Sequence, residues 1–101
     1  MFCRVIRSFA TIGTEDIFNG KNTAAARRTC PSALWAVAVR KLDQLDSVTA
    51  LQELRIPPGN RLETLISTRK GQHSIRINDQ YRICFKWTDL GTEAVEIVDY
   101  H

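Results

Sequence analysis

The chain has 101 residues, enough for one modest hydrophobic core and too few for two, and its 44% hydrophobic and 25% charged residues are ordinary for a globular protein. No run approaches the ~18 apolar residues of a membrane-spanning helix, and the opening residues lack the continuous apolar stretch of a signal peptide. The chain has three cysteines without a C-x-x-C spacing and only two histidines. This pattern predicts neither a disulfide scaffold nor a zinc centre. We therefore expect one cytoplasmic domain over residues 1–101, with no metal and no cofactor.

The net charge of +3 is unevenly distributed along the chain. Residues 55–86 carry seven Lys or Arg against two carboxylates, whereas residues 87–101 carry four carboxylates and no Lys or Arg. A basic segment of this kind suits nucleic acid, an anionic partner protein, or a merely solvated surface. Charge alone leaves these three interpretations open.

The first part of the chain predicts a strand and a short helix. Residues 5–9 predict a short first strand. Thr14 is a candidate N-cap for a helix that ends at Asn19-Gly20, because the two residues after Thr14 are carboxylates that suit the helix dipole. Residues 21–30 are polar and predict a loop.

A longer helix is expected next. Pro31 suits its first turn, and apolar residues recur at helical spacing to about Asp46, which predicts packing against a sheet. Thr49 and Gln52 have the spacing of a capping box and predict one or two further helical turns. Residues 55–60, RIPPGN, predict a loop because two consecutive prolines remove backbone donors.

The second half predicts strands. Residues 61–66 predict one strand and residues 94–100 predict the last, with two more between them. The order is one strand, two or three helices and then four strands. It predicts a single α+β domain, in which an antiparallel or mixed sheet of about four to five strands has two or three helices packed on one face.

The segment GQHSIRINDQYRICFKW, residues 71–87, predicts two strands around a tight turn at residues 78–80. Apolar residues occupy every second position, so one face of this hairpin is expected to be buried. The other face carries three cations: Arg76, Arg82 and Lys86. Because the planar donor fork of arginine matches phosphate oxygens, this face suggests a surface for phosphate.

The chain lacks the short motifs of serine hydrolases, P-loop proteins, dinucleotide-binding proteins and zinc proteases. The basic face of the hairpin and the Tyr100-His101 end of the chain fit RNA cleavage without a metal. In that reaction the ribose 2′-OH attacks its neighbouring phosphate. That reaction needs a base, cations for the developing charge and an acid for the leaving oxygen. His101 can carry a proton near neutral pH, and Tyr100 can stack on a base or donate a hydrogen bond.

Four segments together resemble a known family. They are VIRSF at 5–9, PPGNRLE at 57–63, GQHSIRINDQYRICF at 71–85 and VEIVDYH at 95–101. The chain resembles toxins of the HigB (plasmid maintenance killer) type in the RelE/ParE superfamily, and it looks closest to the GraT-like branch. The resemblance implies a RelE-like fold and a ribosome-dependent mRNA endonuclease that cuts in the 30S A site and inhibits translation. It also implies a HigA-like helix-turn-helix antitoxin, operator DNA bound only through the toxin–antitoxin complex, and no membrane.

The resemblance also implies site residues. Arg82 would contact phosphate, and Tyr100 and His101 would belong to the cleavage centre. Many family members carry an L-H-x-L-K-G segment, where this chain has LETLIS, so that Glu63 stands in place of the family histidine and Ile66 in place of the lysine. We hypothesise that Glu63 acts in catalysis and that nearby basic residues bind RNA: Arg61, Arg69, Lys70, His73, Arg76 and Lys86.

Two alternatives remain open from the sequence. One is a ParE-like toxin that poisons gyrase without nuclease activity, and the other is a catalytically weak member that only binds RNA or a partner. The family typically begins with Met directly before I-R-S-F, where this chain has Val5. We therefore expect residues 1–4 to be an extension before a start at Val5.

Overall fold

The structure, a computed structural model, describes residues 5–66 and 69–100. The predictions for residues 1–4 and for His101 lie outside these ranges. The described chain folds as three α-helices and four strands: α1 (Ile12–Phe18), α2 (Ala24–Thr29), α3 (Trp35–Leu45), β1 (Glu63–Thr64), β2 (Gln72–Arg76), β3 (Tyr81–Thr88) and β4 (Gly91–Asp99). Three short 3-10 turns lie between them: η1 (Ser32–Leu34), η2 (Leu51–Arg55) and η3 (Pro58–Asn60).

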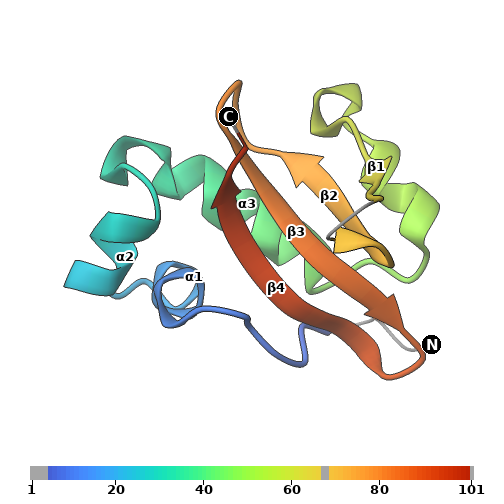
Figure 1. The fold of residues 1–101 in the computed structure, drawn as a ribbon, viewed down its shortest axis with the longest axis horizontal. Helices are drawn as coiled ribbons and strands as arrows, with labels where there is room; N and C mark the ends of the chain where they lie inside the picture. The colour runs from blue at the N-terminus through green and yellow to red at the C-terminus, as the bar shows by residue number, and fades with distance from the viewer. Residues whose placement is uncertain (1–4, 67–68, 101) are drawn as a thin grey trace.

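The strands form one antiparallel sheet in the order β1-β2-β3-β4. Figure 1 shows α3 against one face of this sheet, with α1 and α2 beside β4. The predicted α+β architecture is therefore confirmed. Within the described ranges, no helix is long and apolar enough to cross a membrane.

The hairpin of β2 and β3 has the two faces that its alternation predicts. Ile75 pairs with Ile83, and both side chains are fully buried on the core face. Arg76 pairs with Arg82 at the neighbouring position, so both point to the opposite face. This register places two arginines side by side at one end of the sheet.

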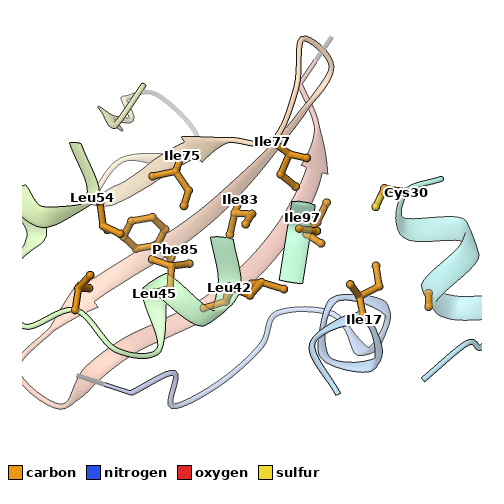
Figure 2. Close-up of a cluster of buried hydrophobic side chains, with 14 residues drawn as sticks. Ile17, Cys30, Leu42, Leu45, Leu54, Ile75, Ile77, Ile83, Phe85 and Ile97 are labelled. Carbon is orange, nitrogen blue, oxygen red and sulfur yellow. The ribbon is translucent and has the colours of Figure 1, made fainter. Parts of the chain in front are cut away.

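The core lies between α3 and the sheet. Figure 2 shows Leu42 and Leu45 of α3 next to Ile83 and Phe85 of β3, and all four are fully buried. The apolar stripe predicted for the long helix is thus its buried face. The helix itself begins at Trp35, because Ser32–Leu34 forms a 3-10 turn after Pro31.

The N-terminal segment differs from its prediction in two ways. Residues 5–9 do not form a regular strand, but make two isolated parallel bridges, from Ile6 to Thr92 and from Phe9 to Val95. Helix α1 begins earlier than expected, because Thr11 is its N-cap and accepts a hydrogen bond from the Thr14 amide at 3.3 Å. Thr14 is instead a buried residue of α1, and its hydroxyl accepts a hydrogen bond from the Ile97 amide at 3.0 Å.

The prediction of a loop over residues 21–30 is wrong in part, because α2 occupies Ala24–Thr29. Thr23 caps this helix by accepting a hydrogen bond from the Ala26 amide at 3.1 Å. Three consecutive alanines are strong helix formers, but the segment lacks a long apolar stripe, so periodicity did not indicate this helix. Only Ala26 of this helix is buried.

Two expectations in the middle of the chain also need correction. The partner of Thr49 is Glu53 rather than Gln52, since the Glu53 carboxylate accepts from the Thr49 amide at 3.1 Å and hydroxyl at 2.8 Å. The strand expected over residues 61–66 shortens to β1, two residues long. Its start is displaced because Arg61 has a left-handed backbone (φ 46°), outside the extended region of a regular strand.

The close approach of α1 and α2 requires a glycine. A Cβ on Gly13 would lie 1.9 Å from the Thr29 hydroxyl oxygen and 2.5 Å from the Ala25 carbonyl oxygen. We expect Gly13→Ala to lower the free energy of unfolding by about 2 kcal/mol, because α2 must move away. Urea denaturation measures this loss. The control is Gly59→Ala, which meets no atom within 4 Å and should change stability by less than about 0.5 kcal/mol.

Candidate anion-binding pocket

A pocket of about 260 Å³ opens at the end of the sheet where Arg76 and Arg82 are paired. Three parts of the chain meet there: the η3 turn with β1, the β2–β3 hairpin, and the end of β4. The lining residues are Arg61, Glu63, Arg76, Asn78, Asp79, Arg82 and Tyr100. Five of these are candidate site residues from the sequence: Arg61, Glu63, Arg76, Arg82 and Tyr100.

Arg82 lies at the base of the pocket, with its side chain only 8% exposed. Its Nε donates a hydrogen bond to the Ser74 hydroxyl at 2.8 Å, and one Nη donates to the Arg61 carbonyl at 2.6 Å. The same nitrogen lies 3.8 Å from a carboxylate oxygen of Glu63. A buried cation is costly unless its donors find acceptors, and these partners supply them. Arg82 is therefore held in one orientation.

Tyr100 covers Arg82. The Arg82 guanidinium carbon lies 5.7 Å from the centre of the Tyr100 ring, a cation–π contact. The Tyr100 amide donates to the Gln80 carbonyl at 2.7 Å, which fixes the chain just after β4 against the hairpin turn. The Tyr100 side chain remains accessible to a ligand, because the residue is 46% exposed.

The hairpin turn forms one rim of the pocket. The Asn78 side-chain oxygen accepts hydrogen bonds from the amides of Gln80 at 2.9 Å and Tyr81 at 2.8 Å, which closes the turn. Arg76 forms an ion pair with Asp79 across the same turn. Asp79 is almost fully exposed, so this pair is a weak one that an anion can displace.

The η3 turn leads directly into Arg61, another residue that lines the pocket. Asn60 is fully buried, and its Nδ2 donates to the Leu54 carbonyl and to the Gln44 side chain, both at 3.0 Å. Its Oδ1 accepts a hydrogen bond from the Lys41 ammonium. Arg61 follows directly with a left-handed backbone, and it is exposed at the mouth of the pocket.

Glu63 supplies a carboxylate to the pocket from β1. It pairs with Ser74 of β2, the residue that also holds Arg82. Its side chain is 53% exposed, so water and ligands can reach it. Three arginines and two carboxylates give the pocket a net positive charge, which suits an anionic ligand.

A second group of cations lies beyond the η3 turn. Arg40, Lys41, Gln44 and Pro57 line a separate pocket of about 300 Å³. Burial lowers the pKa of Lys41, and the nearby positive charges of Arg40 and Arg76 lower it further. Positive charge therefore extends from the anion-binding pocket toward α3.

Four other candidate residues do not join the pocket. Arg69 forms an ion pair with Glu96 at 3.2 Å, and Lys70 is exposed in the turn before β2. Lys86 is exposed on β3, four residues from Arg82. His73 lies on the core face of β2, with its ring centre 5.9 Å from that of Phe85.

The position of His73 predicts a pH dependence of stability. Burial lowers the pKa of His73 below its ordinary 6.5. As the pH falls below about 6.5, the unfolded chain takes up this proton before the folded one does, so the free energy of unfolding falls. We expect wild type to lose more stability than His73→Gln between pH 7.5 and pH 5, by at most about 1.4 kcal/mol per pH unit. Urea denaturation at the two pH values measures the difference, and parallel losses would contradict it.

Sequence reasoning missed the roles of three residues in or next to the pocket. Asn60 falls in a predicted loop, although it is the buried centre of the η3 turn. Asn78 and Asp79 are predicted only as parts of the hairpin turn, yet both line the pocket. An asparagine between a Pro-Pro-Gly run and an arginine is a signal for a specific turn, because its short side chain bonds to nearby backbone.

Comparison with known proteins gives one family. The model of a family described as "RelE-like toxin of type II toxin-antitoxin system HigB" matches residues 7–101. A curated relative, Toxin HigB-1 of Vibrio cholerae, is 50% identical over 62 residues, 61% of this chain and 65% of that protein. An uncharacterised protein of Haemophilus influenzae is 42% identical over 57 residues, 56% of each chain. The chain thus matches less than two-thirds of the length of either relative.

A solved structure shares the fold. It is the YoeB–YefM complex from Staphylococcus aureus, with a TM-score of 0.53 and 20% sequence identity, covering 97% of this chain and 98% of that one. At this identity the likeness concerns the fold alone. It agrees with the α+β architecture, in which an antiparallel sheet carries helices on one face.

Proposed function

The chain belongs to the HigB-like family of RelE-like toxins of type II toxin–antitoxin systems, and from this premise we propose that it is a ribosome-dependent mRNA endoribonuclease. One observation carries the proposal: the pocket joins three arginines to a carboxylate and to an accessible tyrosine ring. Arginines bind phosphate, and an aromatic ring offers a surface on which an RNA base stacks. The combination suits a phosphodiester in single-stranded RNA.

The proposed reaction uses the groups that line this pocket. The Glu63 carboxylate takes the proton from the ribose 2′-OH, whose oxygen then attacks the adjacent phosphorus. The arginines stabilise the extra negative charge on the phosphoryl oxygens as the bond to the 5′-oxygen breaks. An acid returns a proton to that oxygen, and we assign this step to His101, which the resemblance implies for the cleavage centre together with Tyr100. The products are a 2′,3′-cyclic phosphate and a free 5′-hydroxyl.

The proposed partners follow from the family. The toxin would act on mRNA in the 30S A site and would be neutralised by a HigA-like helix-turn-helix antitoxin, with operator DNA bound only through the complex of the two. The related fold in the YoeB–YefM complex supports an antitoxin partner for this chain.

A ribosome-programmed cleavage assay tests the activity. The purified protein, treated beforehand with a chelator, is added to ribosomes that hold a defined codon in the A site. We expect one cut at that codon and a 2′,3′-cyclic phosphate on the upstream fragment. A variant lacking His101 should cut at least about 100-fold more slowly than wild type. An intact message together with inhibited gyrase would overturn the proposal in favour of a ParE-like poison, and an intact message with retained RNA binding would favour a catalytically weak member.

A further inference from the structure

We propose that Arg61 is the main phosphate-binding cation of this pocket, in place of the family lysine that Ile66 replaces, and that Asn60 and Arg82 are positioning residues that hold it there. The proposal rests on the proposed function and assigns separate roles to residues of that same site. It differs from the role that the resemblance implies for Arg82, which is direct contact with phosphate.

The backbone of Arg61 gives the first argument. Its φ of 46° and ψ of 58° lie in the left-handed region, where glycine or asparagine is the usual residue. Arg61 is exposed, so burial does not explain why a large side chain stands there. A strained backbone beside a pocket motivates a functional hypothesis for the side chain at that position.

Hydrogen bonds on both sides impose this conformation. The Asn60 amide donates to the Pro57 carbonyl at 2.9 Å, and the Arg61 amide donates to the Pro58 carbonyl at 3.1 Å. The buried Asn60 side chain anchors this turn to the segments before it. On the other side, Arg82 donates to the Arg61 carbonyl at 2.6 Å. The position of Arg61 is therefore fixed from its own turn and from β3.

The two arginines differ in how free their side chains are. Arg82 is buried and bonded to Ser74 and to the Arg61 carbonyl, so it cannot follow a phosphate without losing those bonds. Within residues 5–66 and 69–100, no carboxylate forms an ion pair with the Arg61 side chain. Arg76 is paired with Asp79, so an anion must displace that exposed carboxylate before it can bind Arg76. Arg61 is thus the pocket arginine whose charge is available at the mouth.

The position of Ile66 completes the argument. Ile66 is 81% exposed and follows β1 by two residues, so the family lysine position offers no charge here. Arg61 precedes β1 by two residues and lines the anion-binding pocket. This chain therefore has a cation just before β1, at Arg61, whereas the family lysine would stand just after β1.

The first experiment separates the side chain of Arg61 from its backbone. Arg61→Gly and Arg61→Ala both remove the cation, and only glycine favours the left-handed conformation. We expect both to slow single-turnover cleavage by about 100-fold and to weaken binding of an RNA methylated at the attacking 2′-oxygen. The Tm of Arg61→Gly should exceed that of Arg61→Ala by about 4 °C. Arg61→Lys should retain part of the activity, and Arg28→Gln on α2, which also removes one exposed cation, should match wild type.

Each outcome has a defined meaning. Wild-type cleavage and RNA binding in Arg61→Gly would overturn the proposal for Arg61. Absence of cleavage by wild type would reject the proposed function instead. The binding measurements with the methylated RNA would then still decide whether Arg61 holds phosphate, since equal affinity of wild type and Arg61→Gly would overturn that role.

The second experiment tests the positioning role of Arg82 with a double-mutant cycle. If Arg82 acts through Arg61, then Arg82→Gln, Arg61→Ala and the double variant should each lose about 100-fold in cleavage. If each arginine contacts phosphate independently, the losses should multiply to about 10⁴-fold, which would overturn the positioning role. Should Arg82→Gln fail to fold, Ser74→Ala takes the place of Arg82→Gln in the cycle, because it removes one hydrogen-bond acceptor of Arg82.

Discussion

Replacing Asn60 by alanine is expected to lower the free energy of unfolding by about 3 kcal/mol, because three buried or half-buried partners lose their hydrogen bonds at once. The substitution removes the donor for the Leu54 carbonyl and the Gln44 side chain, and the acceptor for the Lys41 ammonium. Buried polar groups left without partners account for most of this cost. Equilibrium denaturation in urea measures the loss.

The same substitution should also reduce cleavage beyond what instability explains. Asn60 sets the turn that presents Arg61, so the folded fraction of Asn60→Ala should bind RNA less tightly than wild type. The control is Asn22→Ala, which removes an exposed hydrogen bond to Arg27 and should change stability by less than about 0.5 kcal/mol. Equal stability of the two alanine variants would contradict the role given to Asn60.

Local periodicity explains the parts of the fold that the sequence could predict. Alternation along β3 is a property of the strand itself, so it indicates which face packs on the core and which face carries Arg82. The stripe on α3 depends in the same way on helical geometry, and Leu42 and Leu45 are buried as expected. Alternation alone is thus enough to predict that the two arginines of the hairpin share one face.

Long-range contacts account for what the sequence could not predict. The polar face of the hairpin was expected to be open, yet Arg82 is buried because the segment around Arg61 folds over it. No periodicity indicates that residues 21 positions apart will bond. The left-handed turn at Arg61 likewise depends on Asn60, whose partners lie on α3 and η2. The pocket's cations were therefore predictable as a group, and their separate roles were not.

Replacing Glu63 by glutamine is expected to slow cleavage by about 100-fold while leaving RNA binding unchanged or stronger. Glutamine keeps the size of the side chain and cannot accept the proton of the 2′-OH. It also removes a negative charge 3.8 Å from the Arg82 guanidinium, which makes the pocket more attractive to phosphate. Single-turnover cleavage and binding of the methylated RNA, measured on the same preparation, separate the two effects. Unchanged cleavage would remove Glu63 from the mechanism.

Restoring the family residues makes a stronger test of the same site. Histidine titrates nearest to neutral pH of all side chains, so Glu63→His should cleave at least as fast as wild type, and far faster than Glu63→Gln. Ile66→Lys should restore much of the cleavage that Arg61→Ala loses, because it returns a cation to the family position. If Ile66→Lys accelerates wild type but leaves Arg61→Ala inactive, the two positions serve different phosphates. Rescue of Arg61→Ala would mean that the pocket requires one accessible cation and accepts it from either end of β1.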